Sequence, residues 1–355
     1  MKEGRSVPDV LSELKLQQDR KRDYIVPASQ MSLLEDGETF QVQNEAKGQM
    51  ELFQTSALAH RQLASALNIP AKYYDIMASQ KPDLLAQNVN AWLGERDNSY
   101  MLRSFADPMG SILRAFLSDK YRRIDNLEIA LAVLPLFAGS GDYEIVSTEI
   151  TERHFYLKII NHRLEKEVVP GDYVQAGVVI SNSEVGLGAV SVQPLLYRLV
   201  CTNGMIVNEL GERKNHIGRA AKALEESYQI YSDETIEAED KAFLLKLRDT
   251  TMAAIDEGRF GMAVGKLQES VGVPIKGRVQ DVIQLAGKTY DLNQTEQDSI
   301  LNYLIQGGDL TKYGLSNAIT RASQDILSYD RATELESIGW QVATMPGQQW
   351  KVLNE

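Results

Sequence analysis

The segment Gly177–Glu209 combines residue types that can hold an anion or act as a nucleophile. It contains a polar turn with glycines, in which backbone N–H groups can converge on a negatively charged group. Cys201 follows the second strand of the segment, and its thiolate would be a nucleophile if a base lay within reach. The turn is therefore a candidate anion-binding loop, made of Ser181, Asn182, Ser183, Gly186 and Gly188.

This segment does not complete a known catalytic motif. No third glycine opens a helix after Gly186 and Gly188, so the turn lacks a dinucleotide fingerprint. A turn that needs positive φ is the alternative explanation for its glycines. The chain has four histidines, and no local signature ties one of them to Cys201, which we expect to be a buried thiol. We predict no catalytic residue, no cofactor and no metal site.

A second candidate surface lies in Phe116–Asn126, where a strand leads into a helix. Its lysine and arginines would contact phosphates, and its tyrosine would stack on a base. A solvated turn with a helix N-cap is the alternative explanation. Together with the strand end near Cys201, this segment predicts a nucleic-acid-binding surface, made of Arg114, Lys120, Tyr121, Arg122, Arg123, Tyr197 and Arg198.

Carboxylates at strand ends leave a third chemistry open. A metal-dependent nuclease would use such side chains to hold its cation. Carboxylates at strand ends are common, so their presence does not by itself identify a nuclease. The carboxylates concerned are Asp119, Asp125, Asp172 and Glu184.

The net charge of −12 over 355 residues argues against a uniformly basic nucleic-acid coat. The charge is uneven, however. Arg103–Arg123 and Arg198–Lys222 each hold five basic residues against two acids, whereas residues 223–257 hold ten acids against three bases. Dense carboxylates can imitate the charge of DNA, so the acidic region is either a solvated helix face or a surface that binds a host protein.

The composition also limits the compartment. A single cysteine excludes an intramolecular disulfide framework, as expected for a reducing cytoplasm. The N-terminal residues 1–24 are charged and lack the apolar core of a secretory signal. Apolar runs are too short to span a bilayer. We therefore expect a cytoplasmic protein that does not contact a membrane.

The hydrophobic pattern predicts an α+β fold around a mainly antiparallel sheet. Strand-like alternation is clearest in the centre, where Tyr143–Ile150 and His154–Ile160 read as a hairpin. We expect a helical N-terminal subdomain over residues 1–98, an antiparallel α+β core over 99–215, and a helical region over 216–355. A short terminal strand or hairpin is expected in Gly339–Leu353.

Four runs of this chain resemble phage- and plasmid-borne proteins grouped as a domain of unknown function (number 932). The resemblance covers about residues 50 to 340. It implies a mobile-element setting and assigns no catalytic residue, because no activity is established for the family. The runs are QLASALNIPAKYYDIM, RAFLSDKYRRIDN, GVVISNSEVGLGAVSVQPLLYRLVCTNGM and TKYGLSNAITRASQDILSYDRATELE.

From the two basic segments and this setting we expect a DNA-handling protein rather than an enzyme. It would bind single-stranded DNA, as a homo-oligomer that promotes annealing or recombination. A protein that binds a host defence or repair factor, and a metal-dependent nuclease, remain open as alternatives.

Overall fold

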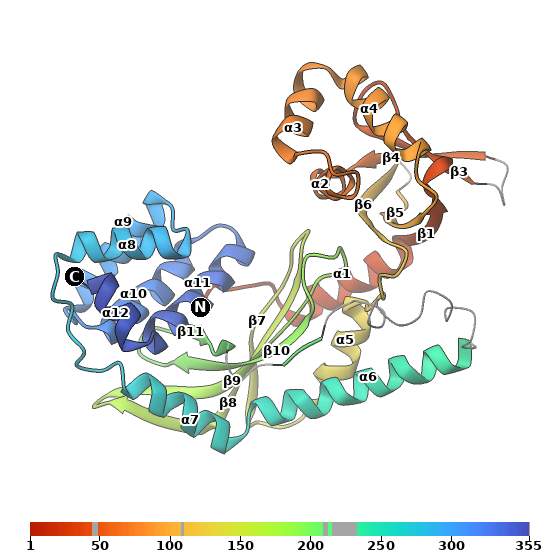
Figure 1. The fold of residues 1–355 in the computed structure, drawn as a ribbon. Helices are drawn as coiled ribbons and strands as arrows, with labels where there is room; N and C mark the ends of the chain where they lie inside the picture. Colours follow the sequence, from red (N-terminus) through yellow and green to blue (C-terminus); the bar gives the residue numbers. More distant parts are fainter. Residues whose placement is uncertain (45–48, 108–109, 209–211, 215–232, 355) are drawn as a thin grey trace.

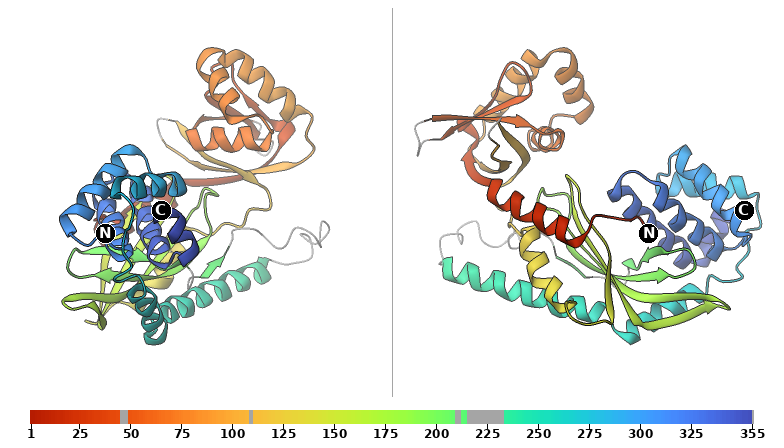
Figure 2. Two further views of the ribbon diagram at one scale, coloured as in Figure 1. Left: turned by 60° about the vertical axis from the view of Figure 1, so that its left-hand side comes forward. Right: turned by 180° about the vertical axis from the view of Figure 1, so that it is seen from behind.

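The computed structural model describes residues 1–44, 49–107, 110–208, 212–214 and 233–354. It shows an α+β protein with two sheets, which confirms the predicted fold class (Figure 1). The first sheet and three helices form a smaller body, and the second sheet and the remaining helices form a larger one. The further views show the two bodies standing apart, with α1 (Val7–Arg20) of the larger body leading into the smaller one (Figure 2).

Helix α1 begins at a strong N-cap and ends directly at a strand. The Ser6 hydroxyl accepts a hydrogen bond from the Asp9 N–H, which satisfies an otherwise unpaired donor of the first turn. Val10 and Leu14 are buried against the larger body. The next residue, Lys21, starts β1 (Lys21–Pro27), so the chain crosses from one body to the other without a flexible linker.

The first sheet has the strand order β1-β5-β6-β4-β3-β2. Strands β4 and β6 pair in parallel, while the other neighbours are antiparallel. The helices between β4 and β5 supply the long crossover that a parallel pair requires. The elements are β2 (Met31–Leu33), β3 (Thr39–Asn44), β4 (Gln49–Thr55), α2 (Ala57–Ala66), α3 (Ala71–Gln80), α4 (Pro82–Gly94), β5 (Ser99–Phe105) and β6 (Ser111–Ser118).

The smaller body therefore differs from the helical subdomain expected over residues 1–98. Four of its strands lie within that range, and β5 and β6 lie beyond it. Phe40 and Val42 alternate along β3 and are buried with Phe53 of β4, Leu63 of α2 and Val89 of α4. The sheet and the helices thus share one core, which neither could form alone.

The second sheet is antiparallel, with the order β11-β10-β9-β8-β7 and β12 paired to β10. The predicted central hairpin is confirmed, although its second strand continues to Val169. Its strands are β7 (Tyr143–Ile150), β8 (Phe155–Val169), β9 (Asp172–Asn182), β10 (Val190–Arg198), β11 (Asn203–Ile206) and β12 (Glu212–Lys214).

Helices cover this sheet through a large apolar core. Side chains of β8 and β9 such as Leu157, Ile159 and Val178 are buried with Ile129 and Phe260 of the covering helices. Among the helices in this core beside α1 are α5 (Asn126–Val133), α6 (Asp233–Ala254) and α7 (Glu257–Gln268). Tyr313 and Trp340, from two later helices, are buried in it as well.

The C-terminal helices form their own core and contact the sheet through two of their number, α10 and α11. Lys158 of β8 and Glu336 of α11 form a fully buried ion pair at 2.6 Å. No helix in the described ranges is long and apolar enough to cross a membrane. The helices are α8 (Val279–Tyr290), α9 (Gln294–Gly307), α10 (Lys312–Ala322), α11 (Tyr329–Thr344) and α12 (Gly347–Asn354).

The strand or hairpin expected over Gly339–Leu353 is wrong, because α11 and α12 occupy this range. Gly339 does not mark a turn. It allows α11 to approach α10 closely, since a Cβ at this position would lie 2.3 Å from Cγ2 of Thr320. The first part of the helical region expected over 216–355, up to residue 232, lies outside the described residues.

Candidate functional site: a junction of the two bodies

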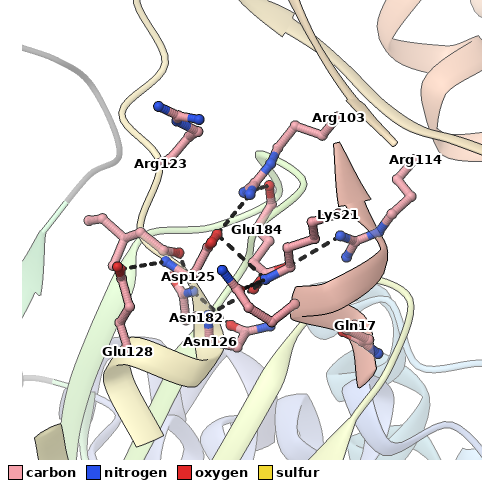
Figure 3. Close-up of polar contacts among 12 residues, drawn as sticks. Gln17, Lys21, Arg103, Arg114, Arg123, Asp125, Asn126, Glu128, Asn182 and Glu184 are labelled. Carbon is pink, nitrogen blue, oxygen red and sulfur yellow. Dashed lines mark hydrogen bonds and ion pairs between the residues drawn. The ribbon is translucent and has the colours of Figure 1, made fainter. Parts of the chain in front are cut away.

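The candidate anion-binding loop and the basic segment meet where the two bodies join (Figure 3). The loop connects β9 to β10, and the basic segment connects β6 to α5. Side chains from β1 and β5 of the smaller body complete the site. We call this group the junction cluster, and it consists of Lys21, Asp23, Arg103, Arg114, Asp125, Asn126, Asn182 and Glu184.

Glu184 holds the larger body's loop to the smaller body. Its side chain is buried, and its Oε1 lies 2.5 Å from Nζ of Lys21. The same oxygen accepts the backbone N–H of Asn126 at 2.8 Å, and Oε2 accepts Nη1 of Arg114 at 3.2 Å. Both carboxylate oxygens are therefore occupied by donors of the protein.

Arg103 makes the corresponding contacts from the smaller body, from the middle of β5. Its Nε and Nη2 donate to Asp23 at 3.0 and 3.2 Å, and Nη2 also donates to Asp125 at 2.7 Å. Its Nη1 donates to the backbone carbonyl of Glu184 at 2.9 Å. A buried guanidinium is stable only when such partners replace its water.

The electrostatics of the cluster follow from burial and pairing. Burial alone lowers the pKa of Arg103, but the carboxylates of Asp125 and Asp23 outweigh this and raise its pKa above the ordinary value. Burial likewise favours the neutral acid at Asp125, yet Arg103 and Lys21 hold the pKa of Asp125 below its usual range. The folded cluster therefore stabilises both groups in their charged forms.

Arg114, which we predicted to contact phosphate, belongs to this buried network. Its side chain is 14% exposed, and its guanidinium carbon lies 3.9 Å from the centroid of the Phe105 ring. Burial lowers the pKa of Arg114 below its ordinary value, and the attraction of Glu184 does not fully offset this. Its guanidinium therefore pairs with Glu184 inside the protein and is not presented to a phosphate.

The predicted anion-binding loop is also engaged internally. Nδ2 of the buried Asn182 donates to the Ile124 carbonyl at 3.0 Å, and Oγ of the buried Ser183 accepts the Leu187 N–H at 3.1 Å. Ser181 pairs with Ser191 in the sheet. At Gly188 a Cβ would lie 3.2 Å from Nε2 of His154.

The tip of the loop inserts against the smaller body. Nε2 of Gln62, on α2, donates to the Val185 carbonyl at 2.7 Å. Gly186 has a φ of +78°, and a Cβ there would lie 2.5 Å from Cδ2 of Leu117. This close approach, together with the left-handed backbone, explains why the position suits glycine.

Some side chains of the basic segment bind other parts of the protein, and others are exposed to solvent. The Tyr121 hydroxyl donates to the Ser183 carbonyl at 2.9 Å, and Arg122 forms an ion pair with Asp240 of α6. Lys120 is exposed. Arg123 is 60% exposed, although its Nη1 lies 3.5 Å from Asp23.

Tyr197 and Arg198 do not join this surface. They lie at the end of β10 that is about 25 Å from its start beside the loop. As neighbours in a strand they point to opposite faces, and Tyr197 packs on a small apolar cluster around Ile160 and Ile206. Arg198 instead binds Asp172, with Nε at 2.7 and 2.8 Å from its two oxygens.

Three of the four carboxylates considered for a nuclease are bound to cations of the protein. Glu184 and Asp125 belong to the junction cluster, and Asp172 binds Arg198 and the Tyr313 hydroxyl. Asp119 lies on the turn after β6. Among the described residues, no group of three or more His, Cys, Asp or Glu side chains is arranged to hold a metal ion.

The sequence prediction missed Lys21, Asp23 and Arg103. A signal for Arg103 was present, because it stands in the run YMLRSF, where apolar residues precede it and the strand is buried along both faces. A charge at such a position requires a buried partner. Its partner Asp23 lies 80 residues earlier in the chain, so the sequence did not identify it.

The family model described as Domain of unknown function (DUF932) matches residues 115–257. The resemblance to this family is confirmed over that segment, which is narrower than the 50 to 340 expected. The segment contains both the loop and the basic turn of the junction cluster. No curated protein and no solved structure matches the chain.

Proposed function

We propose that the protein is a DNA-handling protein of a phage or plasmid, and that it binds single-stranded DNA in the cytoplasm as an oligomer. The observation that carries this proposal is the exposure of Lys120 and Arg123 beside a cluster whose other cations are neutralised. In a chain of net charge −12, such cations mark where phosphates can approach.

A third cation lies in the strand that bears Asp23. Arg22 is exposed, and its guanidinium donates to the backbone carbonyls of Asp19 at 2.9 Å and Lys21 at 2.6 Å. These carbonyls carry no formal charge, so the positive charge of Arg22 remains available. As a neighbour of Asp23 in β1, however, Arg22 points to the opposite face of the strand from the Asp23–Arg123 pair. The contact surface that we propose is therefore narrower than the sequence predicted and consists of Lys120 and Arg123.

Binding to a labelled single-stranded oligonucleotide, followed by fluorescence anisotropy over a salt series, tests this proposal. Neutralising two phosphates gives a slope of log K against log[salt] of about −1.4. We expect the double variant Lys120→Gln/Arg123→Gln to bind weakly and with a shallower slope. Arg163→Gln, which removes a 74% exposed arginine of β8, is the matched control. Equal binding by all three proteins, or none at low salt, would refute the proposed surface.

Oligomeric annealing is tested separately. Light scattering of the purified protein gives its assembly state, and fluorescence quenching follows the pairing of two complementary labelled strands. We expect an oligomer that accelerates pairing, and we expect the double variant to lose this acceleration. A monomer that binds strands without pairing them would limit the function to strand binding.

A second candidate function, binding of a host protein, is favoured by a groove between α5 and α6. The groove is lined by apolar side chains, of which Leu131 is 58% and Leu245 47% exposed, and by Lys241 and Arg248. An acidic amphipathic segment would complement it. If this function holds, a stoichiometric host protein co-purifies without nucleic acid, and Leu131→Glu abolishes its capture while strand binding persists.

A further inference from the structure

A cleft of about 300 Å³, lined by both apolar and polar side chains, lies away from the junction cluster, between the β10–β11 turn and helices α9 and α10. Two residues that drew attention in the sequence, Arg198 and Cys201, line it. Their guanidinium and thiol are in contact, with Nη1 3.5 Å from Sγ. The helices contribute Tyr303, Asn317 and Arg321, and Asp309 lies between the helices.

One face of α10 forms a wall of the cleft. Gly314, Asn317, Ala318 and Arg321 all line it and are spaced three and four residues apart, which places them on one stripe of the helix. This stripe extends about 10 Å along the helix axis. The cleft is therefore an elongated groove that has the arginine at one end.

The two ends of the groove carry opposite charges. Arg321 stands in the last turn of α10, whereas Asp309 lies just before its N-cap, Thr311. Gly314 allows the Asp309 backbone to cross the helix start, since a Cβ would lie 1.8 Å from the Asp309 carbonyl oxygen. This contact places the carboxylate-bearing residue at the far end of the groove.

Neither charge forms an ion pair in the described parts of the chain, although Asp325 accepts a hydrogen bond from the hydroxyl of Tyr303 at 2.7 Å. Arg321 stacks over the Tyr303 ring, 5.3 Å from its centroid, and no described carboxylate lies within 4.0 Å of its guanidinium. Asp309 forms no ion pair with any described lysine, arginine or histidine. Arg198, by contrast, is already bound by Asp172.

We propose that this cleft binds a nucleoside monophosphate, either free or as the phosphorylated end of a single strand. The Arg321 guanidinium binds the phosphate, as such groups do in bidentate geometry. Asp309 accepts hydrogen bonds from the amino group of the base, and the Asn317 amide supplies a further donor and acceptor. Repulsion between Asp309 and phosphate fixes this orientation. If the ligand is the phosphorylated end of a strand, the inference rests on the proposed binding of single-stranded DNA.

Cys201 provides a reporter for this site, because it is the chain's single cysteine and is partly exposed in the cleft. We expect deoxycytidine and deoxyadenosine monophosphates to slow its labelling by a maleimide. Deoxythymidine monophosphate should protect less, since thymine has no amino group for Asp309. Inorganic phosphate should protect least, because it cannot reach Asp309.

Two variants and a control test whether Arg321 binds the phosphate and Asp309 binds the base. Arg321→Gln should raise the half-protecting concentration of deoxycytidine monophosphate about tenfold or more, as expected for a lost charge-assisted hydrogen bond. Asp309→Asn should reduce the preference over deoxythymidine monophosphate. Arg61→Gln, on the exposed surface of α2, should leave protection unchanged. The inference is overturned if no nucleotide protects, or if inorganic phosphate protects equally well.

A phosphorylated oligonucleotide separates the two sources of the ligand. If the strand end is bound, a 5′- or 3′-phosphorylated oligonucleotide protects Cys201 more than the unphosphorylated strand. If both strands protect equally poorly while mononucleotides protect, the ligand is the free nucleotide. If the wild-type protein binds no single strand at low salt while mononucleotides still protect Cys201, the proposed function is rejected and this inference is kept.

Discussion

The junction cluster and the α10 cleft contain the same residue types, yet they differ in how the charges are satisfied. Arg103 in the junction contacts two carboxylates and a carbonyl, whereas Arg321 in the cleft contacts an aromatic ring and no described carboxylate. A guanidinium with all its partners inside the protein fixes two bodies relative to each other. A guanidinium without such partners is available to a ligand.

The two sites also differ in their position relative to the segment that the family model matches. The loop and the basic turn, both within residues 115–257, build the junction. Arg321 lies outside that range. We infer that the shared motifs maintain the arrangement of the two bodies, and that ligand contacts are made at their margin and in the cleft.

The largest effect is expected from Arg103→Ala. This change removes the nearest cation of both Asp23 and Asp125 from a buried site, which should lower the free energy of unfolding by about 3–5 kcal/mol. Urea denaturation measures it. Arg163→Ala is the control, since its exposed pair with Asp142 contributes at most about 1 kcal/mol. If both variants lost a similar free energy of unfolding, the charges of the junction cluster would not be buried and paired as described.

Two glycines with positive φ sharpen the comparison. Gly186 in the junction and Gly308 at the end of α9 have φ of +78° and +67°. An alanine in either place is strained, but a Cβ at Gly308 meets no atom within 4 Å, whereas at Gly186 it meets Leu117. Thermal or urea unfolding should show Gly186→Ala to be less stable than Gly308→Ala by about 1–3 kcal/mol. Equal losses would mean that Leu117 moves away without penalty.

The acid dependence of stability should also identify the junction. The folded-state pKa of Asp125 is below its ordinary value of 3.8, so the unfolded chain binds the proton more readily. The stabilisation is complete above pH 3.8 and is lost as pH falls through 3.8 towards the folded-state pKa. Between pH 6 and pH 3 the free energy of unfolding should therefore fall less steeply for Asp125→Asn than for the wild type. Asp97→Asn, on an exposed segment, should keep the wild-type slope.

The smallest effect on stability is expected in the cleft. Arg321→Gln removes a cation–π contact with Tyr303, which contributes about 1 kcal/mol or less. The variant should therefore unfold almost as the wild type does, while nucleotide protection of Cys201 is lost. A loss of stability as large as that of Arg103→Ala would show that Arg321 has a structural role instead.

Local patterns predicted the elements better than they predicted the site. The alternation within His154–Ile160 identified β8, and its pairing with Tyr143–Ile150 was expected as well. That strands within residues 1–98 join β5 and β6 in one sheet was missed, because the parallel pairing of β4 with β6 joins segments on either side of three helices. The terminal strand was wrong because Gly339 serves helix packing rather than a turn.

The junction cluster itself depends on contacts between distant positions. Lys21 and Glu184 are separated by 163 residues, and Arg103 and Asp23 by 80. The sequence marked the loop and the basic turn as special, but it did not show that their charges neutralise each other and those of β1 and β5. That depends on tertiary structure, which brings the two bodies together.

Hydrogen exchange of Glu184→Ala tests the role of the junction most directly. Losing this carboxylate removes the partners of Lys21, Arg114 and the Asn126 N–H at once. We predict faster exchange on both sides of the junction, in β1 and β5 as well as at the start of α5, and no such change in Arg321→Gln. Faster exchange confined to residues 183–189 of the loop would contradict the account.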